Sequence, residues 1–149
     1  MILNRQRRIP LAVGPLTSFC EQVQRELGFP EESVTVCFVS DPAIARMNRK
    51  FRGKQGPTDV LSFPAHQSTA RGARLLRRRQ NRPGHYVGDI VISPATARRY
   101  ARRRSYGLAS ELRVLILHGM IHLAGFDHEN DSGEMMQLER RLRRRLGLR

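Results

Sequence analysis

The chain has no long hydrophobic run, few acidic residues and only two cysteines. No stretch approaches the roughly 18 uninterrupted apolar residues of a membrane helix, so we expect no membrane segment. The N-terminus lacks the apolar core of a secretory signal; its arginines and lack of acid leave a mitochondrial presequence as the alternative to a cytoplasmic location. Cys20 and Cys37 form no C-x-x-C pair, which favours two reduced core thiols over a disulfide or a ligand role.

The shortage of acid leaves the chain strongly basic. It has 27 lysines and arginines against 13 acids, for a formal net charge of +14, and only two of the cations are lysine. Such a charge favours a polyanionic partner, and nucleic acid is the commonest one. The alternative is a highly soluble protein from an arginine-rich genome, which would have the same net charge and the same excess of arginine over lysine. Charge alone also does not separate RNA from DNA or from an anionic membrane surface.

A length of 149 residues, 40% of them hydrophobic, suits one compact domain spanning 1–149. Apolar periodicity and helix start and stop signals predict helices at 15–27, 41–52, 94–104, 109–124 and 131–146. β-Branched and apolar runs predict strands at 34–39, 59–63 and 87–92. Because strands and helices do not alternate regularly, the pattern indicates an α+β fold. In the second helix we expect Ile44, Met47 and Phe51 to face the core.

Two segments concentrate positive charge. The predicted C-terminal helix, 131–146, is basic on its outer faces. The segment 66–86 is rich in arginine, contains no acid and is punctuated by glycine and proline. We interpret it as a mobile surface loop, or alternatively as a loop that follows a phosphate backbone through Arg77, Arg78 and Arg79.

Three of the five histidines fall within 11 residues. His118 and His122 are one turn apart on a predicted helix, so both imidazoles lie on one face and can bind one cation. Gly125 then ends the helix, and the reversed chain brings His128 toward the pair. Three imidazoles leave a fourth position open for water, as in catalytic zinc sites. All-imidazole ligation favours Zn2+, with Ni2+, copper or iron as alternatives.

Two acids are candidates for orienting these imidazoles. Glu111 precedes His118 by seven residues and so lies on nearly the same helical face. It also lies in the first turn of its helix, where the dipole alone favours an acid. Asp127 directly precedes His128. The alternative to a metal site is a set of surface histidines, but an apolar helix has little other use for two of them on one face.

The spacing H-x-x-x-H-x-x-G-x-x-H resembles that of the metzincin proteases, with Gly119 in place of their glutamate. Peptide hydrolysis by a zinc-bound water needs that base to protonate the departing amine, so the sequence disfavours a protease. We hypothesise that glycine at this position avoids a carboxylate that would repel a phosphodiester.

A second segment, 47–64, begins with a basic turn that leads into a predicted strand. Such a turn would bring a guanidinium to the edge of a cleft, where its fork suits a phosphate. Basic residues also stabilise a helix C-terminus, which is an alternative explanation for several of the four cations of this turn. The candidate RNA contacts of this turn are Arg49, Lys50, Arg52 and Lys54.

Four motifs follow one another in the chain: N-R-x-F-R, P-T-D-V-L-S-F-P, G-D-I-V-I-S and H-G-x-x-H-L-x-G-F-D-H. These motifs lie between residues 48 and 128 and resemble the YbeY family of bacterial endoribonucleases, a resemblance that covers roughly 35–130. The resemblance implies a small mixed sheet of about four strands surrounded by about five helices, with the metal site at the end of the central apolar helix. It implies one zinc ion held by His118, His122 and His128, and it places the family's functional arginine at Arg52.

The same resemblance implies metal-dependent cleavage of single-stranded RNA, in maturation of the 3′ end of 16S ribosomal RNA and in ribosome quality control. Expected partners are ribosomal RNA and ribosome or assembly proteins, and a monomer is favoured. One alternative is an RNA-binding ribosome-assembly factor whose zinc is mainly structural, and another is a hydrolase of a small phosphate ester. The segment 66–86 departs from the family pattern, because it is longer and richer in arginine.

Overall fold

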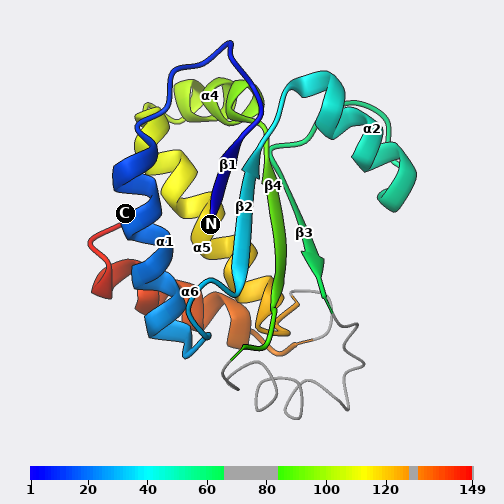
Figure 1. Ribbon diagram of the computed structural model, residues 1–149. Coiled ribbons are helices and arrows are strands. Elements are labelled where there is room, and N and C mark those ends of the chain that lie inside the picture. The colour runs from blue at the N-terminus through cyan, green and yellow to red at the C-terminus, as the bar shows by residue number, and fades with distance from the viewer. Residues whose placement is uncertain (66–83, 128–130, 149) are drawn as a thin grey trace.

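The computed structural model describes residues 1–65, 84–127 and 131–148. Its strands are β1 (Ile2–Asn4), β2 (Val34–Phe38), β3 (Val60–Pro64) and β4 (Gly88–Ile92). Its helices are α1 (Val13–Leu27), α2 (Asp41–Arg52), α4 (Pro94–Arg103), α5 (Leu108–Leu123) and α6 (Glu134–Arg145). The expected α+β fold is confirmed, with five helices around one sheet in this part of the chain (Figure 1).

The four strands form a mixed sheet in the order β1-β2-β4-β3. β1, β2 and β4 are parallel, and β3 pairs antiparallel with β4. β3 is therefore an edge strand. The sequence did not predict β1, because three residues are too short for a periodic pattern. Its parallel pairing with β2 holds it in the sheet, and the Met1 amino group donates to the carbonyl of Val34 at 2.9 Å.

The two faces of the sheet are covered differently. α1 and α5 pack on one face (Figure 1), where Phe38, Ile90 and Ile116 are fully buried. α5 is apolar on nearly all sides because neighbours surround it, as expected for a helix in a core. On the other face, Ile44 of α2 packs against Leu61 and other apolar residues of a smaller core. The face covered by α5 is the one that positions the histidines.

Gly119 is the one glycine of α5, and it lies where that helix approaches Ile90 of β4 closely. A Cβ atom at this position would lie 3.0 Å from two side-chain carbons of Ile90. Gly119 is buried, so a side chain there would enter the core and not the solvent. Close helix–sheet packing is therefore a sufficient reason for this glycine. The hypothesis that it avoids a carboxylate beside the phosphodiester stays a prediction.

Helix ends agree with the predicted ones to within a few residues, and the largest difference is at α6. The helix predicted from 131 begins at Glu134, because Asp131 acts as its cap from outside. The Asp131 carboxylate accepts hydrogen bonds from the backbone N–H groups of Gly133 at 2.8 Å and Met135 at 2.9 Å. The cap satisfies N–H groups that have no partner within the helix.

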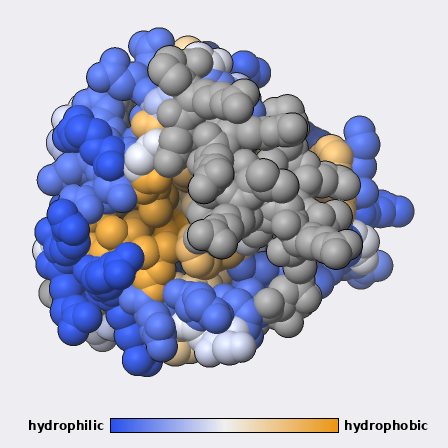
Figure 2. All heavy atoms as spheres, turned by 90° about the horizontal axis from the view of Figure 1, so that it is seen from below, coloured by the Kyte–Doolittle hydropathy of each residue, from blue (hydrophilic) through white to orange (hydrophobic). Residues whose placement is uncertain are grey.

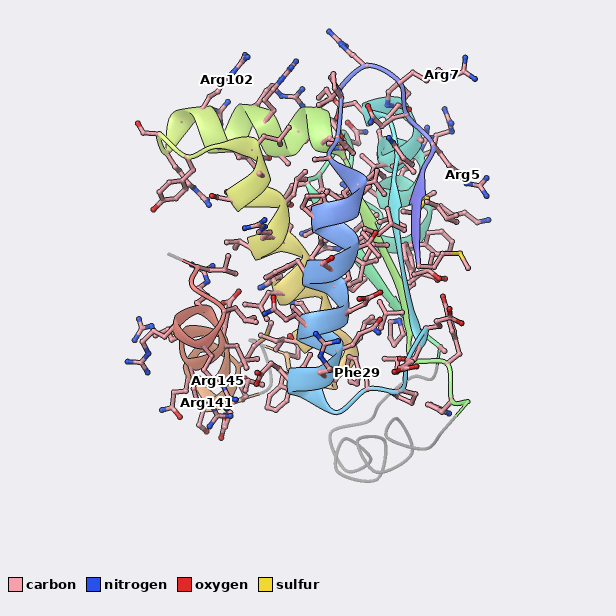
Figure 3. The ribbon with its side chains drawn as sticks, turned by 60° about the vertical axis from the view of Figure 1, so that its left-hand side comes forward. Arg5, Arg7, Phe29, Arg102, Arg141 and Arg145 are labelled. Atoms are coloured by element: carbon pink, nitrogen blue, oxygen red, sulfur yellow. The ribbon has the colours of Figure 1, made fainter. Side chains whose placement is uncertain are left out.

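Positive charge is spread over separate parts of the surface. Arg5, Arg7 and Arg102 project at one end of the molecule, and Arg141 and Arg145 project from α6 (Figure 3). Seen from below, the surface is mostly hydrophilic around one apolar area (Figure 2). None of the helices in the described ranges has the length and hydrophobicity to cross a membrane.

Both cysteines are free thiols, as the sequence indicates. Cys20 is buried, and this burial raises the pKa of its thiol to about 12. A thiol with such a pKa is neither a ready nucleophile nor a ready metal ligand.

Candidate active site

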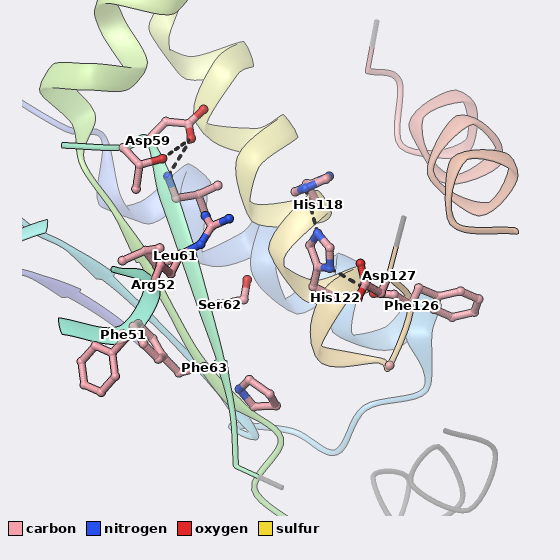
Figure 4. A pocket seen from close by; sticks show the side chains of 14 residues that line it. Phe51, Arg52, Asp59, Leu61, Ser62, Phe63, His118, His122, Phe126 and Asp127 are labelled. Carbon is pink, nitrogen blue, oxygen red and sulfur yellow. Dashed lines mark hydrogen bonds between the residues drawn. The ribbon is translucent and has the colours of Figure 1, made fainter. Parts of the chain in front are cut away.

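A cavity of about 650 Å³ lies beside the edge strand β3 (Figure 4). It brings together two segments that are far apart in the sequence, the end of α2 with the strand that follows it and the end of α5. The lining residues are Phe51, Arg52, 58–64, His118, His122 and 125–127. Arg52 of the basic turn and the histidine pair singled out in the sequence thus share one site.

His118 and His122 converge as their spacing predicts. Their Nε2 atoms are 3.0 Å apart, and the two rings are edge-to-face with centroids 4.6 Å apart. Both residues come from the last turns of α5, whose neighbours Leu117, Met120 and Ile121 are fully buried. The packed core therefore fixes the backbone that presents the two imidazoles.

The outer nitrogen of each ring has a hydrogen-bond partner that only accepts. His122 Nδ1 lies 3.0 Å from the carbonyl oxygen of Phe126, and His118 Nδ1 lies 3.2 Å from Oε1 of Glu139. Both acceptors favour the tautomer with the hydrogen on Nδ1, which leaves a lone pair on the Nε2 atom of each neutral ring. The two Nε2 atoms lie next to each other at the cavity.

This arrangement fits a metal ion. Two nitrogen atoms 3.0 Å apart that both carry lone pairs repel each other unless a proton or a cation is shared between them. Two zinc–nitrogen bonds of about 2.0–2.1 Å at a tetrahedral angle place their nitrogens roughly 3.3 Å apart, close to the observed separation. Hydrogen bonds from the outer nitrogens to a carboxylate and a carbonyl are the usual support of zinc-bound histidines.

Several predicted site residues lie outside the described residues. They are His128, the expected third ligand, and Arg77, Arg78 and Arg79 of the segment 66–86. Within the described ranges, no group of three potential metal ligands comes together. The complete ligand set, the zinc ion and the RNA contacts of that segment stay predictions.

Glu139 is the site residue that the sequence analysis missed. It comes from α6, its side chain is 14% exposed, and Arg143 Nη2 lies 3.6 Å from the same oxygen that meets His118. A signal was available in the sequence, since Glu139 is the only acid among the arginines that follow Glu134. Its meaning depends on the packing of α6 beside α5, which local patterns do not reveal.

The two acids proposed from the sequence are placed differently. Asp127 lines the cavity near His122 (Figure 4). Glu111 does not line this cavity; it is buried beside a separate one, with Arg104 3.9 Å from its carboxylate. Burial raises the pKa of Glu111. The structure thus brings Glu139, and not Glu111, to the ring of His118.

The cavity has two walls: His118 and His122 form the histidine wall, and the end of α2 with β3 forms the other. Arg52 belongs to this second wall. α2 is capped at its C-terminus by Gly53, which has a φ of 65° and so adopts the left-handed conformation that favours glycine. The Asn48 side-chain amide donates a hydrogen bond to the carbonyl of Gly56 at 3.0 Å. These contacts fix the turn that carries Arg52. Its guanidinium has no hydrogen bond or ion pair with the described part of the chain. The other cations of the turn, Arg49, Lys50 and Lys54, are exposed and do not line the cavity.

The position of Phe51 differs from the predicted one. The helical pattern predicts that it faces the core, but it is 58% exposed. Ile44 is fully buried in the same helix, whereas the last turn of α2 extends beyond the sheet (Figure 1). The ring of Phe51 instead packs edge-to-face on Phe63, with centroids 5.1 Å apart.

Comparisons with known proteins agree with this architecture. The profile of a family described as Endoribonuclease YbeY matches residues 4–147. An "Endoribonuclease YbeY" of Koribacter versatilis is 37% identical over 99% of this chain and 86% of its own length. One of Geobacter metallireducens is 36% identical over 89% of this chain and 82% of its own. The solution structure of TM1509 from Thermotoga maritima superposes with a TM-score of 0.62 at 25% identity, covering 98% of this chain and 89% of that one.

Proposed function

Because the chain belongs to the YbeY family of endoribonucleases, we propose that it is a zinc-dependent endoribonuclease that cleaves single-stranded RNA. We propose that it acts in the cytoplasm with ribosome or assembly proteins, in maturation of the 3′ end of 16S ribosomal RNA and in ribosome quality control. The observation that carries the proposal is the meeting of His118, His122 and Arg52 in one cavity.

The histidine wall would hold the metal. His118 and His122 would supply two nitrogen ligands, and His128 is the predicted third. When bound, zinc supplies a Lewis acid and lowers the pKa of a coordinated water to about 7. The carboxylate of Glu139 and the carbonyl of Phe126 keep both Nδ1 atoms protonated, so that the Nε2 lone pairs stay directed into the cavity.

The opposite wall would hold the phosphodiester. The guanidinium of Arg52 can donate two parallel hydrogen bonds to phosphate oxygens and neutralise the charge that builds up on them during cleavage. The nucleophile is either water or the RNA 2′-hydroxyl. The cleaved ends distinguish them, because a 2′,3′-cyclic phosphate forms only when the 2′-hydroxyl attacks.

Metal analysis coupled to RNA cleavage tests the proposal. The purified protein should contain one zinc per chain and cut a single-stranded RNA but not the corresponding duplex. A chelator should remove zinc and activity together, and added zinc should restore both. Cleavage at the wild-type rate by metal-free protein would contradict the proposal.

The alternative is an RNA-binding ribosome-assembly factor without significant catalysis. The net charge of +14 and the arginines on several surfaces favour RNA binding equally well. In either case affinity should fall steeply as salt rises, because phosphate contacts release counterions. Arg52→Ala separates the two candidates. If the protein is an enzyme, this variant should lose RNA cleavage while it keeps its zinc and most of its RNA affinity.

A further inference from the structure

Phe51 is an exposed aromatic residue directly beside the residues that the proposed function uses. It lines the cavity, precedes Arg52 in the last turn of α2 and is 58% exposed. The planes of its ring and of Phe63 make an angle of 72°. Lys50 Nζ lies 5.3 Å from the ring centroid. An exposed aromatic ring is thus present at the cavity, with the ammonium of Lys50 over the ring.

Single exposed apolar side chains are common, so exposure alone means little. What distinguishes Phe51 is that four cations lie within the six residues 49–54 around it. A ligand that suits this surface has flat apolar faces and carries negative charge. Nucleotides of a single strand have both properties, whereas an apolar protein segment would not use the cations.

We propose that Phe51 is a stacking platform for a nucleobase of the RNA and helps to select single strands. The inference rests on the proposed function. A phosphate bound by Arg52 carries its sugar and base on the same nucleotide, and Phe51 is the adjacent residue. Bases of a duplex are covered by their neighbours on both faces, so they reach an aromatic ring only after costly unstacking.

The surroundings hold the platform in place before RNA binds. Phe63 of β3 supports one side of the ring, and the Asn48–Gly56 hydrogen bond fixes the turn that follows. In Figure 4 the Arg52 side chain lies between the aromatic pair and the histidines. A strand could therefore place one base on Phe51 while the neighbouring phosphate lies between Arg52 and the histidines.

Tryptophan fluorescence reports such stacking directly. The chain contains no tryptophan, so Phe51→Trp introduces a single tryptophan, whose fluorescence can be excited separately from that of the three tyrosines. Stopped-flow mixing with a short single-stranded RNA records binding before cleavage. We expect quenching by the single strand and little quenching by a blunt duplex of the same sequence. Tyr106→Trp is the matched control, since Tyr106 is 40% exposed and lines a different cavity; neither RNA should quench it.

Substitution gives an independent measurement. Phe51→Ala and Phe51→Leu should lower the affinity for single-stranded RNA about tenfold, and Phe51→Trp should keep it. Wild type should also lose affinity when one nucleotide of the RNA is made abasic, whereas Phe51→Ala should bind intact and abasic RNA equally well. That loss of discrimination separates stacking from a general change in folding or charge.

The outcomes separate this inference from the function on which it rests. A wild-type protein that neither binds nor cuts RNA overturns both. Wild-type cleavage together with unquenched Phe51→Trp, or with unchanged RNA affinity of Phe51→Leu, overturns the stacking platform alone. Equal quenching of Phe51→Trp by the single strand and the duplex overturns its role in selecting single strands.

Discussion

The two walls of the cavity are built in contrasting ways. His118 and His122 come from a helix packed in the core, and both Nδ1 atoms are hydrogen bonded. Phe51 and Arg52 come from an exposed helix end, and Arg52 has no polar contact with the described residues. A rigid, hydrogen-bonded wall suits a metal ion, whose ligands must keep their geometry. An exposed cationic wall suits a polymer that supplies its own negative charge.

The largest effect should come from the rigid wall. His122→Ala and His118→Ala each remove one of the proposed nitrogen ligands, so each variant should lose the proposed zinc. Cleavage should fall on the order of a thousandfold, which corresponds to about 4 kcal/mol of transition-state stabilisation. Zinc content and kcat/KM of the same preparations check this. His85→Ala, outside the cavity, is the control and should keep both; zinc-free His122→Ala with full activity would refute the metal's role.

Arg52→Ala should have the next largest effect, on catalysis alone. Loss of a donor that stabilises transition-state charge typically lowers kcat by about 10²–10³. Zinc content should stay at the wild-type value, because Arg52 does not touch the histidine wall in the described structure. Arg52→Lys should recover only part of the rate, since an ammonium lacks the planar fork.

The matched control is Arg49→Ala, which removes the same charge from the same helix outside the cavity. It should weaken RNA binding modestly and leave kcat unchanged. If Arg52→Ala only weakened binding to the same extent as Arg49→Ala, the protein would be better described as an RNA-binding factor.

Local sequence patterns predicted one wall better than the other. The convergence of His118 and His122 follows from the 3.6-residue period of a helix. That helix was predicted at 109–124 from the most apolar segment of the chain. Phe51 was placed wrongly because the same period does not reveal where a helix runs past the edge of a sheet. Glu139 and Gly119 depend on which elements pack beside α5, so their roles became visible only in the tertiary structure.

Glu139→Ala should have a smaller effect that is specific to the metal. Removing a hydrogen-bond partner of a ligating histidine typically costs 10–100-fold in metal affinity. Competition with a zinc chelator measures this, and Glu139→Gln should lie between Ala and wild type because it can still accept from His118. Glu111→Gln tests the acid that the sequence suggested and should leave zinc affinity unchanged. The reverse result would restore Glu111 as the supporting residue.

Gly119→Ala should have the smallest effect, and its sign depends on Ile90. Alanine favours a helix over glycine by about 1 kcal/mol, whereas overpacking a core costs about 1–3 kcal/mol. Because the new Cβ would lie 3.0 Å from Ile90, the variant should lose about 1 kcal/mol of unfolding free energy in denaturant titrations. In an Ile90→Ala background the clashing atoms are gone, so the same substitution should stabilise the protein. A destabilisation of equal size in both backgrounds would contradict packing as the reason for this glycine.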